Sequence, residues 1–178
     1  MTHITLITGG QRSGKSSYAQ RLALSLAERP FYLATARVWD EEFRQRILRH
    51  QRDRGAEWMN IEEEKYLSRH QFGGDTVVID CVTLWATNFF SDNDSDLSLS
   101  LKQLKEEFDR FTAQDARFIF ITNEVGLGGV SVNETQRRFA DLQGWLNQYI
   151  AARADEVILM VSGIPLKVKQ DSSLSHIQ

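Results

Sequence analysis

A loop near the N-terminus has the residue types and spacing of a phosphate-binding loop, or P-loop. Four residues separate Gly9 from the run Gly14-Lys15-Ser16, which matches the pattern G-x-x-x-x-G-K-[ST]. Glycines let backbone N–H groups curl around phosphate oxygens, and the N-terminus of a following helix adds partial positive charge. We expect Lys15 to reach the β- and γ-phosphates of a nucleoside triphosphate and the Ser16 hydroxyl to hold Mg²⁺. The predicted loop consists of Gly9, Gly10, Gln11, Arg12, Ser13, Gly14, Lys15 and Ser16.

The segments on either side of this loop bear on its interpretation. A glycine-rich turn that merely precedes a helix would share the same letters. Residues 4–8, however, form a short apolar run rich in β-formers. After the loop, small and apolar residues repeat at the spacing of a helix with one buried stripe: Ala19, Leu22, Ala23, Leu26 and Ala27. A loop between a strand and a helix is the context that the phosphate-binding pattern requires, so we favour nucleotide binding.

A carboxylate ends another apolar segment. Asp80 follows Val77, Val78 and Ile79, which read as a buried strand. A carboxylate at the C-terminal end of such a strand is placed to hold Mg²⁺, directly or through water. The alternative is that Asp80 only caps the strand. With a P-loop upstream, we favour the metal role.

The predicted helix at 40–54 combines several arginines with one histidine. Guanidinium groups suit phosphate, so this cluster could neutralise a triphosphate, although charged helix faces are usually only solvated. His50 follows Ile47 by three residues and Phe43 by seven, which places it on or beside the buried stripe. On spacing alone, a structural role for His50 is the usual interpretation. The arginines are Arg44, Arg46, Arg49, Arg52 and Arg54.

Two further segments carry weaker signals. Glu124 follows the predicted strand 118–122, and it could act as a base or as an outer partner of a metal. Residues 83–90 are dominated by large apolar side chains, which favours packing or a subunit interface over a ligand site.

Alternating strand and helix patterns predict the fold class. We expect strands at 4–8, 31–34, 76–80, 118–122, 157–161 and 166–169, the last at a sheet edge. Helices are expected after the P-loop, at 40–54, at 97–111 and from a capping box of Ser131 and Glu134 onward. The sequence therefore predicts an α/β, P-loop NTPase-like (RecA-like) fold, with a mostly parallel sheet and helices on both faces. One domain is expected at 1–169, with a polar tail at 170–178.

Composition excludes several other classes of protein. The 178 residues are 42% hydrophobic and 25% charged with a formal net charge of −3, which is typical of a globular domain and argues against a polyanion-binding protein. One cysteine rules out an internal disulfide framework and fits a reducing compartment. The N-terminus lacks the pattern of a signal peptide, and no apolar run is long enough for a membrane span. We expect a cytoplasmic protein without nucleic-acid or membrane partners.

Taken in order, the motifs resemble the bifunctional adenosylcobinamide kinase / adenosylcobinamide-phosphate guanylyltransferase family of cobalamin biosynthesis. The P-loop alone is generic, but the ordered set is specific and extends from Thr8 to Lys169. The matching segments are 8–16, 32–36, 40–43, 46–54, Trp58, 80–88, 122–126, 138–148, 154–157 and 161–169.

The resemblance implies two successive reactions. The first phosphorylates the aminopropanol hydroxyl of adenosylcobinamide with ATP or GTP, and the second transfers GMP from GTP to the new phosphate. The second runs through a guanylylated histidine, which the family motif places at His50. A neutral imidazole can attack an α-phosphate when Lys15, Mg²⁺ and nearby arginines stabilise the departing pyrophosphate.

The resemblance also implies a homotrimer and a wider nucleotide site. Besides the P-loop, the positions that it assigns to the nucleotide are Ala34, Thr35, Ala36, Gln51, Arg52, Asp53, Arg54, Glu62 and Asp80. The chain departs from the family pattern at Gln11, at Gly55 and at Gly129-Val130-Ser131, where the family usually has Ile-Val-Pro after its last glycine. None of these positions is Lys15 or His50.

Other functions fit the sequence less well. A monofunctional P-loop small-molecule kinase would keep Lys15, Ser16 and Asp80 but would form no covalent intermediate. A regulatory GTPase would need the guanine-specificity signature Asn-Lys-x-Asp, which is absent. An ATPase that depends on nucleic acid would need a wider basic surface.

Overall fold

A computed structural model describes residues 1–38, 41, 44–45 and 55–170. Glu41, Arg44 and Gln45 are helical, but the remainder of the predicted helix at 40–54, including His50, lies outside the described residues. The helices and strands are β1 (His3–Gly9), α1 (Lys15–Leu26), β2 (Phe31–Ala34), β3 (Met59–Glu62), β4 (Thr76–Asp80), α3 (Val82–Asp92), α4 (Leu97–Thr112), β5 (Arg117–Ile121), α5 (Glu134–Arg153), β6 (Glu156–Val161) and β7 (Ile164–Lys169).

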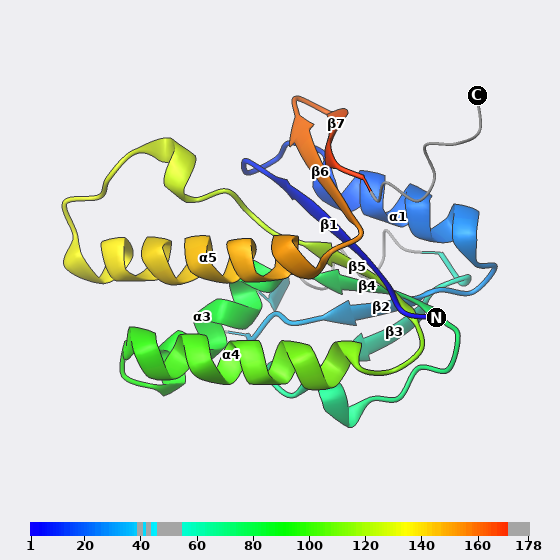
Figure 1. Ribbon diagram of the computed structural model, residues 1–178, viewed down its shortest axis with the longest axis horizontal. Coiled ribbons are helices and arrows are strands. Elements are labelled where there is room, and N and C mark those ends of the chain that lie inside the picture. The colour runs from blue at the N-terminus through cyan, green and yellow to red at the C-terminus, as the bar shows by residue number, and fades with distance from the viewer. Residues whose placement is uncertain (39–40, 42–43, 46–54, 171–178) are drawn as a thin grey trace.

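A seven-stranded sheet in the order β3-β2-β4-β5-β1-β6-β7 forms the centre of the molecule. All neighbouring strands run parallel except β7, which pairs antiparallel with β6 (Figure 1). Each predicted strand is present, and the one at 166–169 is an edge strand that begins earlier, at Ile164. β3 at the opposite edge was not predicted, because Met59–Glu62 is short, polar and largely exposed.

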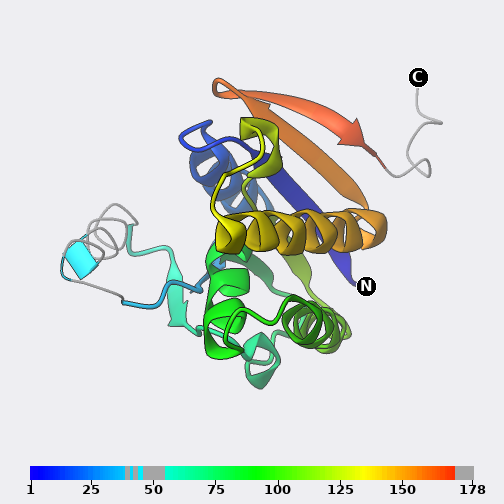
Figure 2. The same ribbon diagram turned by 90° about the vertical axis from the view of Figure 1, so that its left-hand side faces the viewer.

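Helices cover both faces of the sheet, as predicted. α1 packs on one face, where Ala19 and Ala23 join a buried cluster with Ile7, Val78 and Ile158. The other face carries α3, α4 and α5 over a larger cluster. The two views show these layers, with β7 at one end of the sheet and β3 at the other (Figures 1 and 2).

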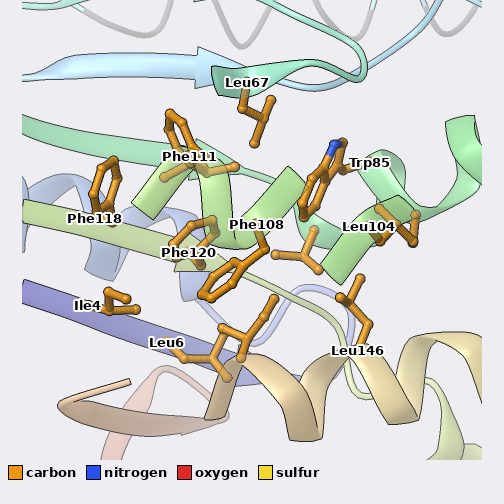
Figure 3. Packing of buried hydrophobic residues seen from close by; sticks show 14 of the residues in the cluster. Ile4, Leu6, Leu67, Trp85, Leu104, Phe108, Phe111, Phe118, Phe120 and Leu146 are labelled. Atoms are coloured by element: carbon orange, nitrogen blue, oxygen red, sulfur yellow. The ribbon is translucent and has the colours of Figure 1, made fainter. Parts of the chain in front are cut away.

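Aromatic rings fill the larger cluster. Phe111 on α4 lies with its ring centroid 4.7 Å from that of Phe118 and 6.2 Å from that of Phe120, both on β5. Phe108 contacts Phe120 one turn earlier, at 5.2 Å (Figure 3). These rings are fully buried. Such packing fixes α4 against the central strands and gives the sheet a rigid frame.

The α3 helix confirms that residues 83–90 serve packing. Trp85, Phe89 and Phe90 are buried in the larger cluster, and the Trp85 indole N–H donates to the carbonyl of Lys65 at 2.8 Å. Asn88 on the same helix is also buried. The segment therefore belongs to the hydrophobic core of the chain.

The start of α5 differs from the prediction. The N-cap residue is Asn133, whose side chain accepts a hydrogen bond from the Gln136 N–H at 3.0 Å, so the predicted capping box of Ser131 and Glu134 is wrong. Ser131 instead donates its hydroxyl to the Gln136 side chain at 2.6 Å and accepts from the Asn133 N–H. Asparagine caps a helix as well as serine does, and here it stands two residues closer to the first helical turn.

None of the helices within residues 1–38, 41, 44–45 and 55–170 combines the length and the apolar character that crossing a bilayer requires.

Candidate functional site

The P-loop connects β1 to α1 at the edge of the sheet where the parallel strands end. Gly14 is the N-cap of α1 and has a left-handed backbone, with φ of 92°. Its carbonyl accepts the first bond of the helix from the Tyr18 N–H at 3.0 Å. The N–H groups of the first turn therefore point into the loop, where their partial positive charge favours an anion.

Close packing against the turn between β6 and β7 fixes the shape of the loop. Gly9 has φ of 148°, and a Cβ atom there would lie 2.6 Å from the carbonyl oxygen of Met160. The Ser13 carbonyl accepts from the Gly163 N–H at 2.9 Å. The predicted loop is therefore preformed by contacts that a side chain at position 9 would disrupt.

Lys15 lies inside the loop rather than in solvent. It is 7% exposed, and its ammonium donates to the carbonyl of Gly10 at 2.6 Å and to the Ser13 hydroxyl at 3.5 Å. Burial lowers the pKa of Lys15, an effect that negative charge on Cys81 or Asp80 would oppose. Burial also raises the pKa of the Cys81 thiol to about 12.

Ser16 and Asp80 converge from two different elements. The Ser16 hydroxyl donates to the carboxylate of Asp80 at 3.4 Å. Tyr32 on β2 donates its hydroxyl to the same carboxylate oxygen. Two hard oxygen donors beside a P-loop fit Mg²⁺. The described side chains hold no cluster of three or more His, Cys, Asp or Glu residues placed for a metal, and a nucleotide-bound Mg²⁺ needs none, because phosphates and water supply its other ligands.

Thr35 supports the position of Asp80 from within the protein. It is fully buried, its N–H donates to the Asp80 carbonyl at 3.0 Å, and its hydroxyl bonds both the N–H and the carbonyl of Cys81. Asn88 on α3 donates to the Thr35 carbonyl at 2.8 Å. The Thr35 side chain thus holds the strand end that carries Asp80.

Ala34, Glu62 and Asp80 end three adjacent strands. In the register of the sheet, Ala34 is opposite Glu62 on β3 and opposite Asp80 on β4. Four strand spacings separate β3 from β1, which places Glu62 about 19 Å from the P-loop along the edge. Ala36 follows in the same edge segment. This row could accommodate the part of a nucleotide that lies far from the γ-phosphate.

Arg37 and Trp58, which lie before and after segment 39–54 in the chain, each make specific contacts. Before it, Arg37 donates to Asp92 at 2.6 and 3.0 Å and to Glu64 at 2.7 Å, and Arg37 and Lys65 lower the pKa of Asp92. After it, the buried Trp58 packs edge-on against the ring of Tyr32, with centroids 5.6 Å apart. The predicted site residues His50, Gln51, Arg52, Asp53 and Arg54 lie outside the described residues.

Glu124 also lies at this edge, beside the P-loop. Its backbone N–H donates to the Gly9 carbonyl at 3.1 Å, and its side chain accepts from the Thr8 hydroxyl at 2.7 Å. The sequence pointed to Glu124 but did not reveal the residues that hydrogen-bond its side chain. Two of the missed residues had weak sequence signals for a place in the site: Thr8 directly precedes the P-loop, and Tyr32 is the only polar residue of β2. Asn147 on α5 had no such signal in the sequence.

Comparisons with known proteins give the family context of this site. Residues 5–168 match the family model described as "Cobinamide kinase / cobinamide phosphate guanyltransferase". The chain is 38% identical over 169 residues to the "Bifunctional adenosylcobalamin biosynthesis protein CobP" of Pseudomonas aeruginosa, covering 92% of this chain and 96% of that protein. Over 179 residues it is 35% and 33% identical to the corresponding CobU proteins of Salmonella typhimurium and Escherichia coli, covering 92% of this chain and 98% of each relative.

A solved structure confirms the fold class alone. The crystal structure of the flagellar accessory protein FlaH from Methanocaldococcus jannaschii is similar with a TM-score of 0.51 at 15% identity, over 96% of this chain and 80% of that one. The predicted α/β, P-loop NTPase-like architecture is correct.

The packing of Gly9 leads to a prediction about stability. We expect Gly9→Ala to lower the free energy of unfolding by about 1–3 kcal/mol, because the new methyl group would press on the Met160 carbonyl and the backbone would be strained. Gly10→Ala is the matched control, since nothing lies within 4 Å of a Cβ atom there, and it should change stability by less than about 0.5 kcal/mol. Urea unfolding of both variants measures the difference in their free energies of unfolding. Equal values would contradict the close contact between Gly9 and Met160.

Proposed function

The chain belongs to the cobinamide kinase / cobinamide phosphate guanyltransferase family, and on that premise we propose how its residues divide the two reactions of the family. The protein is a bifunctional enzyme that phosphorylates adenosylcobinamide with ATP or GTP and then transfers GMP from GTP to adenosylcobinamide phosphate. In this proposal one P-loop binds the triphosphate for both reactions, and His50 carries the guanylyl group.

The P-loop residues position the triphosphate and neutralise its charge. The ammonium of Lys15 faces the inside of the loop, where its bonds to Gly10 and Ser13 would give way to phosphate oxygens. The first turn of α1 adds its free N–H groups. Because phosphoryl transfer depends chiefly on placement and charge stabilisation, these groups supply most of what the kinase step needs.

Mg²⁺ is part of the proposal. Ser16 and Asp80 would hold it, and Tyr32 would keep the Asp80 carboxylate in place. When bound, the ion neutralises charge on the β- and γ-phosphate oxygens. The approach of Ser16 to Asp80 beside a buried P-loop lysine is the observation that carries the proposed site.

The guanylyl transfer uses the triphosphate differently. The neutral imidazole of His50 would attack the α-phosphorus of GTP, the bond to the β-phosphate would break, and pyrophosphate would leave with the bonding electrons. Lys15 and the arginines at positions 49, 52 and 54 would stabilise that leaving group. The cobinamide phosphate would then attack the phosphorus of the guanylylated histidine and release the imidazole.

The quaternary structure and compartment follow from the same family resemblance. We infer a homotrimer in the cytoplasm. Exposed apolar side chains on the β6–β7 hairpin support an assembly, because an apolar edge strand is a surface that a neighbouring subunit can cover. These side chains are Val161, Ile164, Leu166 and Val168, which are 52–69% exposed.

Replacing Lys15 tests whether one triphosphate site serves both reactions. We expect Lys15→Ala to lower both cobinamide phosphorylation and GMP transfer by about 10²-fold or more, because both would lose a cation that stabilises developing charge. Rates of the two reactions are measured separately, with a variant of the exposed Lys102 on α4, Lys102→Ala, as the control. If either reaction kept its rate, the enzyme would have two separate nucleotide sites.

Replacing His50 separates the two reactions. We expect His50→Ala to lower GMP transfer by about 10⁴-fold or more, the effect of removing a covalent nucleophile, while most of the phosphorylation of adenosylcobinamide persists. The assay supplies adenosylcobinamide phosphate directly, so that GMP transfer does not depend on the first step. His3→Ala at the opposite end of β1 is the control. Unchanged GMP transfer in His50→Ala would exclude the nucleophile.

A further inference from the structure

A network of buried polar side chains ends at the carboxylate of Glu124. Gln143 and Asn147 lie four residues apart on α5, on the side that faces the sheet, and they are 1% and 7% exposed. Thr122, which directly follows β5, is fully buried beside them. Buried amides destabilise a core unless they are hydrogen-bonded. Here the amide nitrogens of Gln143 and Asn147 both donate hydrogen bonds, although the side-chain oxygen of Gln143 has no partner among the described residues, and the bonds lead to one carboxylate at the edge of the sheet.

The bonds of this network run in one direction. The Gln143 amide donates to the Thr122 hydroxyl at 2.8 Å, and that hydroxyl donates to the Asn147 side-chain oxygen at 2.7 Å. The Asn147 amide nitrogen is therefore the end that faces Glu124, and it donates to Oε1 at 3.3 Å. Thr8 donates to the same oxygen at 2.7 Å. Two donors on Oε1 suit an ionised carboxylate and hold it in one orientation.

The position of Glu124 places this carboxylate beside the phosphate end of the nucleotide site. β5 lies between β1 and β4, so Glu124 stands between the P-loop and the strand that carries Asp80. Its N–H bonds the Gly9 carbonyl, which continues the pairing of the two strands to the first glycine of the loop. Within the described part of the chain, no hydrogen bond or ion pair engages its second oxygen, Oε2.

Asp80 and Glu62, the described carboxylates that end β4 and β3 at this edge, are less suited to accept a proton from a substrate. Asp80 is engaged by Ser16 and Tyr32 and belongs to the proposed metal site. Glu62 ends a strand about 19 Å from the P-loop along the sheet edge. Glu124 alone among them combines a fixed orientation, an available oxygen and a place next to the phosphate loop.

We propose that Glu124 accepts the proton of the aminopropanol hydroxyl in the kinase reaction. The hydroxyl oxygen forms a bond to the γ-phosphorus, and the bond from that phosphorus to the β,γ-bridging oxygen breaks. ADP (or GDP) leaves with the electron pair of that bond. The hydroxyl proton passes to Oε2 of Glu124 and then to solvent. This inference rests on the kinase half of the proposed function and does not depend on His50.

The two reactions differ in their need for such a base. A hydroxyl must lose its proton as it attacks, so the kinase reaction needs an acceptor. The phosphate of adenosylcobinamide phosphate is already largely ionised at pH 7, because the second pKa of a phosphate monoester is about 6. A neutral imidazole also carries its lone pair without losing a proton. Removing the base therefore affects phosphorylation and spares GMP transfer.

The test compares Glu124→Gln with wild type in both reactions. We expect kcat for phosphorylation of adenosylcobinamide to fall by about 10²–10⁴-fold, with little change in the KM for ATP. The acid limb of the pH–rate profile for phosphorylation should disappear in the variant. GMP transfer to supplied adenosylcobinamide phosphate should stay near the wild-type rate, which also reports that the variant is folded. Glu134→Gln, an exposed carboxylate in the first turn of α5, is the control and should leave both reactions unchanged.

Two results would overturn the proposal. One is phosphorylation near the wild-type rate in Glu124→Gln, and the other is an equal loss of both reactions in a variant that melts like wild type. Should Glu124→Gln lose its fold, Glu124→Asp provides the second test, because it keeps a carboxylate in the network. It should retain the acid limb of the phosphorylation profile, and loss of that limb would contradict the assignment. Failure of the His50 mechanism would leave these outcomes unchanged, since it concerns only GMP transfer.

Discussion

The approach of the Ser16 hydroxyl to the Asp80 carboxylate, at 3.4 Å, is the contact on which the site depends. These residues are far apart in the chain, and only the parallel arrangement of β1, β5 and β4 brings their ends to one edge. The loop beside them is shaped by Gly9, which packs on Met160 of β6. A triphosphate site therefore results from the register of the whole sheet and not from the P-loop alone.

Polar side chains in the interior hold the carboxylates of the candidate site in place. The Thr35 hydroxyl holds the end of β4 through the backbone N–H of Cys81, and the Tyr32 hydroxyl orients the Asp80 carboxylate. Between the P-loop strand and β4, α5 contributes Asn147 to orient Glu124, which follows β5. Tyr32 and Asn147 lie on a strand and a helix of the rigid frame, and Thr35 directly follows β2. Such preorganisation suits phosphoryl and guanylyl transfer, where placement of charge supplies most of the rate.

Most of the fold and the centre of the site could be predicted from the sequence. Apolar strands such as 76–80 and the spacing around Gly9 and Lys15 carry local signals that depend on few neighbours. β3 could not be predicted, because an exposed edge strand needs no apolar pattern. The roles of Tyr32 and Asn147 were also missed, since they arise from contacts between elements distant in sequence. The capping prediction at Ser131 failed because Asn133 competes for the same position.

The central claim is that one P-loop enzyme carries GMP covalently between its two substrates. Incubation with GTP that is radioactive at the α-phosphate, followed by quenching, tests this claim most directly in wild type and His50→Ala. We predict that wild type retains label in an acid-labile, base-stable bond, as expected for a phosphoramidate, and that His50→Ala retains none. Wild-type protein that binds GTP but takes up no label would contradict the claim and would favour a kinase without a covalent intermediate.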